Sequence, residues 1–127
     1  MVVHRFEPLS GKVLGAALHV HRSLGAGFLE GVYERALVVA LSTRGLSIET
    51  QKEVRIRYAG IEVGRHRLDL LVEGRVIVEI KAVEHLQPIH LAQVRSYLRA
   101  TDLQIGLLLN FNSPTLQVRR VVNRADT

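Results

Sequence analysis

Residues 68–81 read Leu-Asp-Leu-Leu-Val-Glu-Gly-Arg-Val-Ile-Val-Glu-Ile-Lys, two short apolar runs joined by a segment that contains glycine. Runs of this kind predict a β-hairpin. Because successive side chains of a strand point to opposite faces, each run presents one purely aliphatic face. The other faces carry Asp69, Glu79 and Lys81. Core strands rarely carry charge, so these three residues are the first candidates for a functional site.

The register of this hairpin follows from matching its two aliphatic faces, because a slip of one residue would send one apolar set to the wrong side. A three-residue loop gives the match, and it pairs Val72 with Val76, Leu70 with Val78, Leu68 with Ile80, and Asp69 with Glu79. In that register the carboxylates of Asp69 and Glu79 are cross-strand neighbours, with side-chain roots about 5 Å apart. Like charges so placed repel unless a cation lies between them. We therefore expect a site for a divalent metal.

Three further segments carry polar residues at defined spacings: residues 27–33 read Gly-Phe-Leu-Glu-Gly-Val-Tyr, residues 93–97 read Gln-Val-Arg-Ser-Tyr, and residues 109–112 read Leu-Asn-Phe-Asn. Together with the Asp and Glu-Ile-Lys of the hairpin, they resemble the GxxExxY protein family of the PD-(D/E)XK nuclease superfamily. The resemblance covers about residues 14–123, and its order and spacing are specific, whereas the hairpin motif alone would be weak. Arg67 and Leu68 stand where the superfamily name has a proline, which many members lack.

The resemblance implies an α/β fold with a three-layer, restriction-endonuclease-like core, in which a mixed β-sheet is flanked by helices. A chain of 127 residues with 47% hydrophobic content is long enough for one domain with a real core. We expect residues 1–127 to form a single nuclease-like domain.

Local sequence signals predict the other elements. Ser10 is expected to cap a helix that ends at Gly25. A second helix over about residues 27–44 is apolar on all sides at 36–41, so we expect it to be the central buried helix. The later elements are expected to be a strand at 52–58, a tight turn at 59–60, a bulge or bend at Gly64, a helix at 88–100, a buried strand at 103–110 and a short final element after 113.

By resemblance, Asp69, Glu79, Lys81 and Glu30 are the catalytic residues. Asp69, Glu79, the backbone carbonyl of Ile80 and Glu30 would hold a metal, and oxygen ligands with open positions favour Mg²⁺ or Mn²⁺ over zinc. Lys81 would orient or activate the attacking water and neutralise charge that develops on the phosphate.

The helical segments supply supporting candidates. Glu34 lies one helical turn after Glu30 and is expected to be a supporting or ion-pairing residue. By resemblance, Gln93 and Tyr97 line the site and position the substrate or Lys81; we expect them on a helix face distinct from the one formed by Leu91, Val94 and Leu98. Tyr33 is expected to be a packed aromatic whose hydroxyl is hydrogen-bonded. We expect His66 to be structural and His90 to reach the rim of the site.

The formal net charge is +5, and fourteen of the seventeen basic residues are Arg, which suits bidentate contact with phosphate. Five of these are expected around the carboxylates: Arg55, Arg57, Arg65, Arg67 and Arg75. They indicate a nucleic-acid partner, although a solvated strand face, with pairs such as Arg57 and Glu62 neutralised, explains them equally well.

The composition also narrows the setting. The chain has no cysteine, no apolar run long enough to span a membrane and no apolar stretch of signal-peptide length at its N-terminus. We therefore expect a cytoplasmic protein with no membrane partner.

Metal-dependent hydrolysis of phosphodiester bonds in nucleic acid, with DNA as the expected substrate, is the function that these observations favour. A homodimer would supply one site for each strand of a duplex. The alternative is a non-catalytic nuclease-fold module that binds nucleic acid or docks onto a larger complex. Two facing carboxylates favour catalysis, because a protein that only binds phosphates has no need of them.

Overall fold

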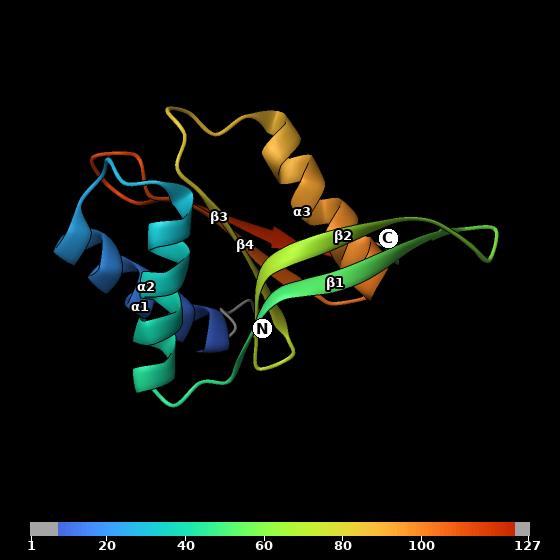
Figure 1. The fold of residues 1–127 in the computed structure, drawn as a ribbon, viewed down its shortest axis with the longest axis horizontal. Helices are drawn as coiled ribbons and strands as arrows, with labels where there is room; N and C mark the ends of the chain where they lie inside the picture. Colours follow the sequence, from blue (N-terminus) through green and yellow to red (C-terminus); the bar gives the residue numbers. More distant parts are fainter. Residues whose placement is uncertain (1–7, 124–127) are drawn as a thin grey trace, which may run out of the picture.

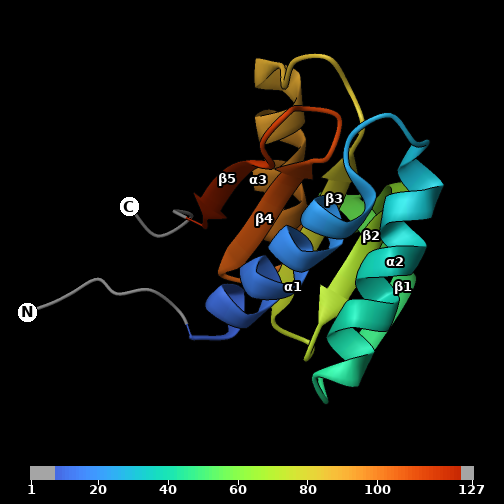
Figure 2. The ribbon, with the colours of Figure 1, turned by 90° about the vertical axis from the view of Figure 1, so that its left-hand side faces the viewer.

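The computed structural model describes residues 8–123. Three helices and five strands follow one another along the chain: α1 (Pro8–Leu24), α2 (Glu30–Thr43), β1 (Ile48–Tyr58), β2 (Ile61–Val72), β3 (Val76–Lys81), α3 (Pro88–Thr101), β4 (Ile105–Asn110) and β5 (Gln117–Val122). The strands form one sheet in the order β1-β2-β3-β4-β5 (Figures 1 and 2). Only β3 and β4 run parallel, and the other neighbouring pairs are antiparallel, so the sheet is mixed.

Helices cover both faces of the sheet. Helices α1 and α2 lie on one face and α3 lies on the other (Figure 2). The alternation of β3 explains this arrangement: Val78 and Ile80 join the apolar cluster under α1 and α2, whereas Ile77 joins the cluster with Val94 and Leu98 of α3. The expected three-layer α/β core with a mixed sheet is confirmed.

Three expectations about the helices are wrong. Ser10 lies inside α1 and is buried, so it does not cap that helix. Helix α2 begins at Glu30 rather than near Gly27, because Gly27 has a φ of 116° and Leu29 is extended. Nor is α2 buried on all sides, since Val39 is 63% exposed. The aliphatic run at 36–41 therefore faces both the core and solvent.

The long β1–β2 hairpin projects beyond the helices (Figure 1). Its strands pair from Ile48 and Val72 to Tyr58 and Ile61. Ala59 and Gly60 form the expected tight turn with φ values of 53° and 79°, which is the pattern of a type I′ turn. The register shifts after Ile56, which pairs with Gly64, while Arg57 pairs with Glu62. Val63 is left over, so the expected bulge lies beside Gly64.

The last third of the chain follows the expected order. Helix α3 ends at Thr101 and is followed by Asp102, a left-handed capping residue with a φ of 60°. Strand β4 begins at Ile105, two residues later than expected. Strand β5 provides the short final element. Among residues 8–123, no helix is long and apolar enough to cross a membrane.

Candidate active site

Strands β2 and β3 pair only near their turn, and the candidate site lies where they separate. The pairs Val72–Val76, Leu71–Ile77 and Leu70–Val78 are present, so the predicted register and its three-residue loop are confirmed there. Glu73 and Gly74 have φ values of 54° and 65°, and the Arg75 N–H donates to the Val72 carbonyl over 3.0 Å.

Beyond Leu70 the predicted ladder is wrong, because carboxylates take the place of backbone bonds. The Asp69 N–H donates to Oε2 of Glu79 over 3.0 Å, and the Ile80 N–H donates to Oδ2 of Asp69 over 2.8 Å. The predicted backbone pairs Leu68–Ile80 and Asp69–Glu79 are absent from the ladder. Leu68 instead joins the cluster under α3, while Ile80 packs under α1 and α2. The carboxylates are nevertheless neighbours, as expected, because each is bonded to the opposite strand.

Burial makes this pair hard to ionise. Glu79 is only 5% exposed, and its burial and the charge of Asp69 raise its pKa to about 8. Burial also raises the pKa of Asp69, although the Ile80 hydrogen bond and the charge of Lys81 oppose the rise. At neutral pH the folded protein therefore favours a proton or another cation between the two groups.

Two glutamates of α2, on the face of the sheet that α1 and α2 cover, interact with the pair. Desolvation, the charge of Asp69 and the charge of Glu34 raise the pKa of Glu30, whereas the charge of Lys81 lowers it. Glu34 accepts a hydrogen bond from Nε2 of Gln51 over 3.0 Å. Gln51 also bonds the side chain of Asp69 and lowers its pKa. Helix α2 thus contributes Glu30 to the charged cluster and connects Glu34 to it through Gln51.

The position of Gln51 could not be predicted from the strand pattern. Gln51 interrupts the pairing of β1 with β2 opposite Asp69, and its φ is 52°. Left-handed residues other than glycine are uncommon and carry strain. Only the break in apolar alternation around residues 49–53 hints at this irregularity in the sequence.

Lys81 lies close to all three carboxylates. Its charge lowers the pKa values of Glu30, Asp69 and Glu79. The parallel ladder with β4 holds its backbone, and its carbonyl accepts the N–H of Phe111 over 2.9 Å. The four predicted catalytic residues therefore form one electrostatically coupled cluster, in which Glu30 is exposed and Glu79 is buried.

A buried asparagine fixes the chain just after Lys81. Oδ1 of Asn110 accepts the Val83 N–H over 3.0 Å, and its Nδ2 donates to the Val83 carbonyl over 2.9 Å and to Oε1 of Gln117 over 2.7 Å. Asn110 is completely buried. A polar residue at the end of the apolar run 105–109 was its signal in the sequence. Its role is to clamp the β3–α3 segment against β4 and β5.

Tyr97 reaches the site from α3. It hydrogen-bonds Nε2 of His66, and the two rings stack at 4.2 Å. Burial and the charges of Glu79 and Asp69 raise the pKa of Tyr97 to about 12, so its hydroxyl stays neutral at ordinary pH. Tyr97 belongs to the same buried cluster as Val94 and Leu98, and the expectation of a separate helix face is wrong.

The neighbours of Tyr97 play different parts. Gln93 is half-buried one turn before Tyr97. His66 has a structural contact, as expected, and this contact is with a candidate site residue, because His66 hydrogen-bonds the Tyr97 hydroxyl. His90 completes the cap of α3, because its Nδ1 accepts the Gln87 N–H over 2.9 Å, and its reach to the rim of the site stays a prediction.

Tyr33 is packed and satisfied, as expected. Its hydroxyl donates to the Gly25 carbonyl over 2.6 Å and accepts the Phe28 N–H over 3.1 Å. Its ring stacks on Phe111 at 4.7 Å. These contacts fix the α1–α2 loop, and so the start of α2 that carries Glu30.

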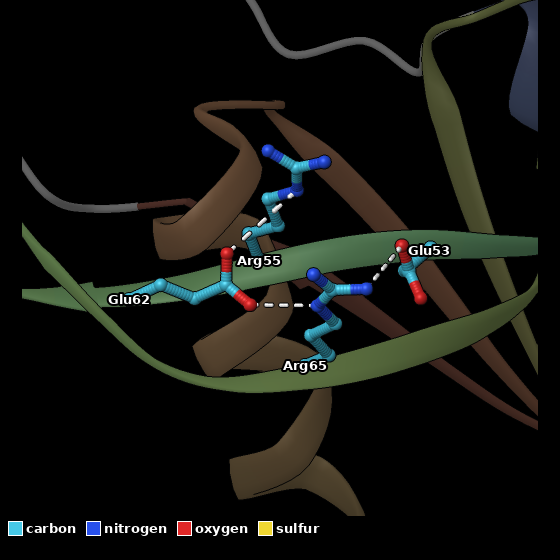
Figure 3. Close-up of polar contacts among 4 residues, drawn as sticks. All are labelled: Glu53, Arg55, Glu62 and Arg65. Carbon is cyan, nitrogen blue, oxygen red and sulfur yellow. Dashed lines mark hydrogen bonds and ion pairs between the residues drawn. The ribbon is translucent and has the colours of Figure 1, made fainter.

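The arginines lie elsewhere than expected. Arg55, Arg57, Arg65 and Arg67 belong to the projecting β1–β2 hairpin, and Arg75 lies in the turn at the far end of β3 from Glu79. Arg57 and Glu62 are ladder partners, but the ion pairs of Glu62 are with Arg65 and Arg55 (Figure 3). The hairpin arginines therefore form a separate charged surface.

The chemistry of the donor set fits a hard divalent cation, although the carboxylates do not form a finished cage. Among residues 8–123, no group of three or more His, Asp or Glu side chains is arranged to hold an ion. Asp69 and Glu79 nevertheless present two adjacent, partly desolvated carboxylates. The Ile80 N–H points toward β2, and the carbonyl of a strand residue lies on the same side as its N–H. Oxygen donors of this kind suit Mg²⁺ or Mn²⁺.

A cavity of about 340 Å³ lies away from this cluster, between α3 and β5. Its lining residues are Leu91, Arg95, Arg99, Arg120, Val121, Val122 and Asn123. Cavity size therefore does not locate the candidate site, which is defined by charge and burial.

Comparison with known proteins agrees with the observed fold. The crystal structure titled "Crystal structure of SSO0001" superposes with a TM-score of 0.55 at 17% identity, over 73% of this chain and 49% of that chain. The described protein therefore shares its fold and spans about half its length. No curated protein matches the sequence. The sequence model of the PD-(D/E)XK nuclease superfamily matches residues 7–121. The chain belongs to the PD-(D/E)XK nuclease superfamily.

Proposed function

We propose that this protein is a metal-dependent nuclease that hydrolyses phosphodiester bonds in DNA, and that it is a GxxExxY member of the superfamily. The observation that carries the proposal is the interlocked pair Asp69 and Glu79, with Lys81 beside it, in a chain of a nuclease superfamily. Membership alone supports a nuclease, and the intact charged cluster supports catalysis.

Asp69, Glu79, the carbonyl of Ile80 and Glu30 would hold Mg²⁺ or Mn²⁺. Such an ion, when bound, supplies a Lewis acid for the scissile phosphate and a water of lowered pKa. The chain itself prepares the site by desolvating the two central carboxylates and by fixing each of them on a backbone N–H. Glu30 completes the acidic wall from α2.

Lys81 would place a fixed positive charge beside the scissile phosphate. Charge that develops on the phosphoryl oxygens is stabilised by preorganised donors in a partly dry site. The ladder between β3 and β4 and the Asn110 clamp hold the backbone of Lys81, so its ammonium is attached to a rigid support.

Gln93 and Tyr97 would position the substrate. The neutral hydroxyl of Tyr97 lies near Glu79 and Asp69 and is held by His66. Gln93 lies one turn toward the start of α3, where its amide can reach a bound strand.

The wider setting belongs to the same proposal. One nuclease-like domain over residues 1–127 carries the site, and a homodimer would present two sites to the two strands of a duplex. A cytoplasmic location remains a prediction of the sequence.

A non-catalytic nuclease-fold module is the second candidate. It is favoured by the absence, within residues 8–123, of a group of three acidic or histidine side chains arranged to hold an ion. Such a module would bind nucleic acid or dock onto a larger complex without cleaving.

The test is incubation of the protein with labelled duplex, branched and single-stranded DNA and RNA, with and without Mn²⁺. Cleavage by wild type that needs the ion and is absent from Asp69→Ala supports the nuclease. Binding without cleavage in every condition supports the non-catalytic module.

A further inference from the structure

We propose that the β1–β2 hairpin is a DNA-binding element, here called the hairpin reader, that lies in the major groove of B-form DNA. This inference rests on the proposed function and adds the form of the substrate. The tip of the hairpin projects beyond the helices (Figure 1), and the hairpin has one charged face and an apolar tip.

The charged face is defined by the pairing of the two strands. The ladder partners are Glu53 with Arg67, Arg55 with Arg65, and Arg57 with Glu62. Ladder partners point to the same face of a sheet. Val54 and Ile56, which alternate with them, pack in the cluster under α3, so the charged residues point away from α3. All six are exposed.

This face keeps an excess of positive charge. It carries four arginines and two glutamates, which leaves two positive charges. Arg65 bonds Glu62 at 2.6 Å and Glu53 at 3.5 Å, and Arg55 lies 3.9 Å from Glu62 (Figure 3). Among the described residues, Arg57 and Arg67 take part in no ion pair. Arg55 directly faces Arg65, a like-charge pair that disfavours pairing of the strands.

The tip exposes apolar side chains. Tyr58 is 77% exposed, Ile61 66% and Val63 61%. The hairpin thus carries exposed arginines on one face and exposed apolar side chains at its tip, and a nucleic-acid groove offers phosphates on its walls and sugars and base edges on its floor.

Shape selects B-form DNA as the partner. The major groove of B-DNA is about 12 Å wide and admits a two-stranded β-ribbon. The major groove of double-stranded RNA is deep and narrow and excludes one. A second copy of this chain is a poorer partner, because about 800 Å² per subunit is needed for a standard interface and three tip side chains supply only part of it.

Strand β2 connects the hairpin tip to the catalytic cluster, and the length of this strand therefore gives the distance between them. Strand β2 carries both Ile61 and Asp69. At about 3.3 Å per residue, the tip lies roughly 26 Å from Asp69. At about 3.4 Å per base pair, this corresponds to roughly 8 base pairs of duplex. The hairpin would therefore contact the duplex to one side of the scissile phosphate.

The experiment compares binding of matched variants to labelled duplex DNA in calcium-containing buffer, at several salt concentrations. The hairpin variant is Arg57→Gln/Arg67→Gln, and the control is Lys12→Gln/Arg22→Gln, which removes two charges from α1. A third variant, Tyr58→Thr/Ile61→Thr, changes the tip while keeping residues that favour strands. Melting curves establish that each variant is folded.

The hairpin variant should bind a duplex of about 20 base pairs at least ~10-fold more weakly than wild type, with a salt slope lower by about 2. The tip variant should also lose affinity for this duplex. The control variant should lose less than about threefold, and the hairpin variant should lose equally little on single strands, duplex RNA or a duplex of about 6 base pairs.

Equal losses in the hairpin and control variants, or equal losses on DNA and RNA duplexes, would overturn the proposal. So would a tip variant that dissociates a wild-type dimer in sedimentation while its DNA binding is unchanged, because the tip would then be an interface between copies. Cleavage by wild type together with unaffected hairpin variants rejects the hairpin reader alone. Absence of any nucleic-acid binding by wild type rejects the proposed function as well.

Discussion

Strand β2 has two charged regions that differ in every physical respect. At its Asp69 end, which we call the inward region, the pairing with β3 stops. There, Asp69 and Glu79 each accept a hydrogen bond from a backbone N–H of the other strand. At its Glu62 end, which we call the outward region, the pairing with β1 continues to the turn. The charged side chains there are exposed to solvent and form ion pairs (Figure 3). Burial raises the pKa of Glu79 to about 8, whereas the Arg65 hydrogen bond lowers the pKa of Glu62.

The difference teaches that residue type did not decide which glutamate is a catalytic candidate. Glu62 is exposed and compensated by arginines, so its ionised form is favoured. Glu79 is buried beside a second carboxylate, so its ionised form is disfavoured until a cation arrives. A strand in which two buried carboxylates replace backbone hydrogen bonds indicates a functional site more strongly than a strand that carries many exposed charges.

The largest expected effect tests whether the inward region is catalytic. Asp69→Ala, Glu79→Ala and Lys81→Ala should each lower metal-dependent cleavage by at least ~100-fold, because each removes a ligand or a charge at the reacting phosphate. Glu62→Gln, a matched change in the outward region, should leave the rate at saturating DNA within about threefold, because Glu62 lies away from the reacting phosphate. Rates measured at saturating Mn²⁺ decide, and similar rates for all four variants would erase the distinction between the two regions.

The next effect concerns stability and pH. The folded-state pKa of Glu79 is raised above its ordinary value of 4.5, so folding favours its protonated form. Its contribution to stability is fully present below about pH 4.5 and is lost as pH rises through about 8. In chelator, Glu79→Gln should therefore be more stable than wild type above pH 8, by an amount on the order of 2 kcal/mol, and this advantage should shrink toward pH 5.

Denaturant unfolding of both proteins across this pH range measures the effect. Glu62→Gln is again the control, because its carboxylate is solvated. If the difference in free energy of unfolding between wild type and Glu79→Gln does not change with pH, then Glu79 is not held in its protonated form.

A smaller effect separates the two glutamates of α2. Glu30→Gln should raise the Mn²⁺ concentration needed for half-maximal activity by about tenfold, because Glu30 is coupled to Asp69 and Lys81. Glu34→Gln should raise it less, since Glu34 acts through Gln51. Activity titrated against Mn²⁺ is the measurement, and a larger shift for Glu34→Gln would reverse the assignment.

The smallest effect concerns the turn of the outward region. Ala59 has a φ of 53° in a turn that favours asparagine. Ala59→Asn should therefore stabilise the protein by about 0.5–1 kcal/mol without changing cleavage. Thermal melting checks this expectation, and a lower melting temperature would show that the turn is not strained at Ala59.

The fold was predictable wherever one simple rule acted. Matching aliphatic faces gave the register of β2 and β3 next to their turn, and the residues that follow Gly25 and Gly45 lie beyond the helices as the glycines indicated. The prediction that Ser10 caps the first helix was wrong. Serine is a common capping residue, but the residue type alone does not show where a helix begins, and this helix spans Pro8–Leu24.

The site was predictable as a set of residues but not as an arrangement. Nothing in the alternation of residues 68–81 signals that the Asp69 and Glu79 side chains replace backbone bonds. The contact of His66 with Tyr97 joins residues 31 positions apart, and the link from Gln51 to Glu34 depends on one left-handed residue. Such contacts depend on tertiary structure, which no local pattern encodes.

Mn²⁺ binding followed by calorimetry at pH 7, in buffers of different ionisation enthalpy, tests the central claim most directly. If Asp69 and Glu79 form a metal site in which Glu79 has a pKa of about 8, Glu79 is mostly protonated at pH 7 and binding should release roughly one proton per ion. Asp69→Ala should not bind, and Glu62→Gln should behave as wild type. Binding that is equally tight in Asp69→Ala, or that releases no proton in wild type, would contradict the account.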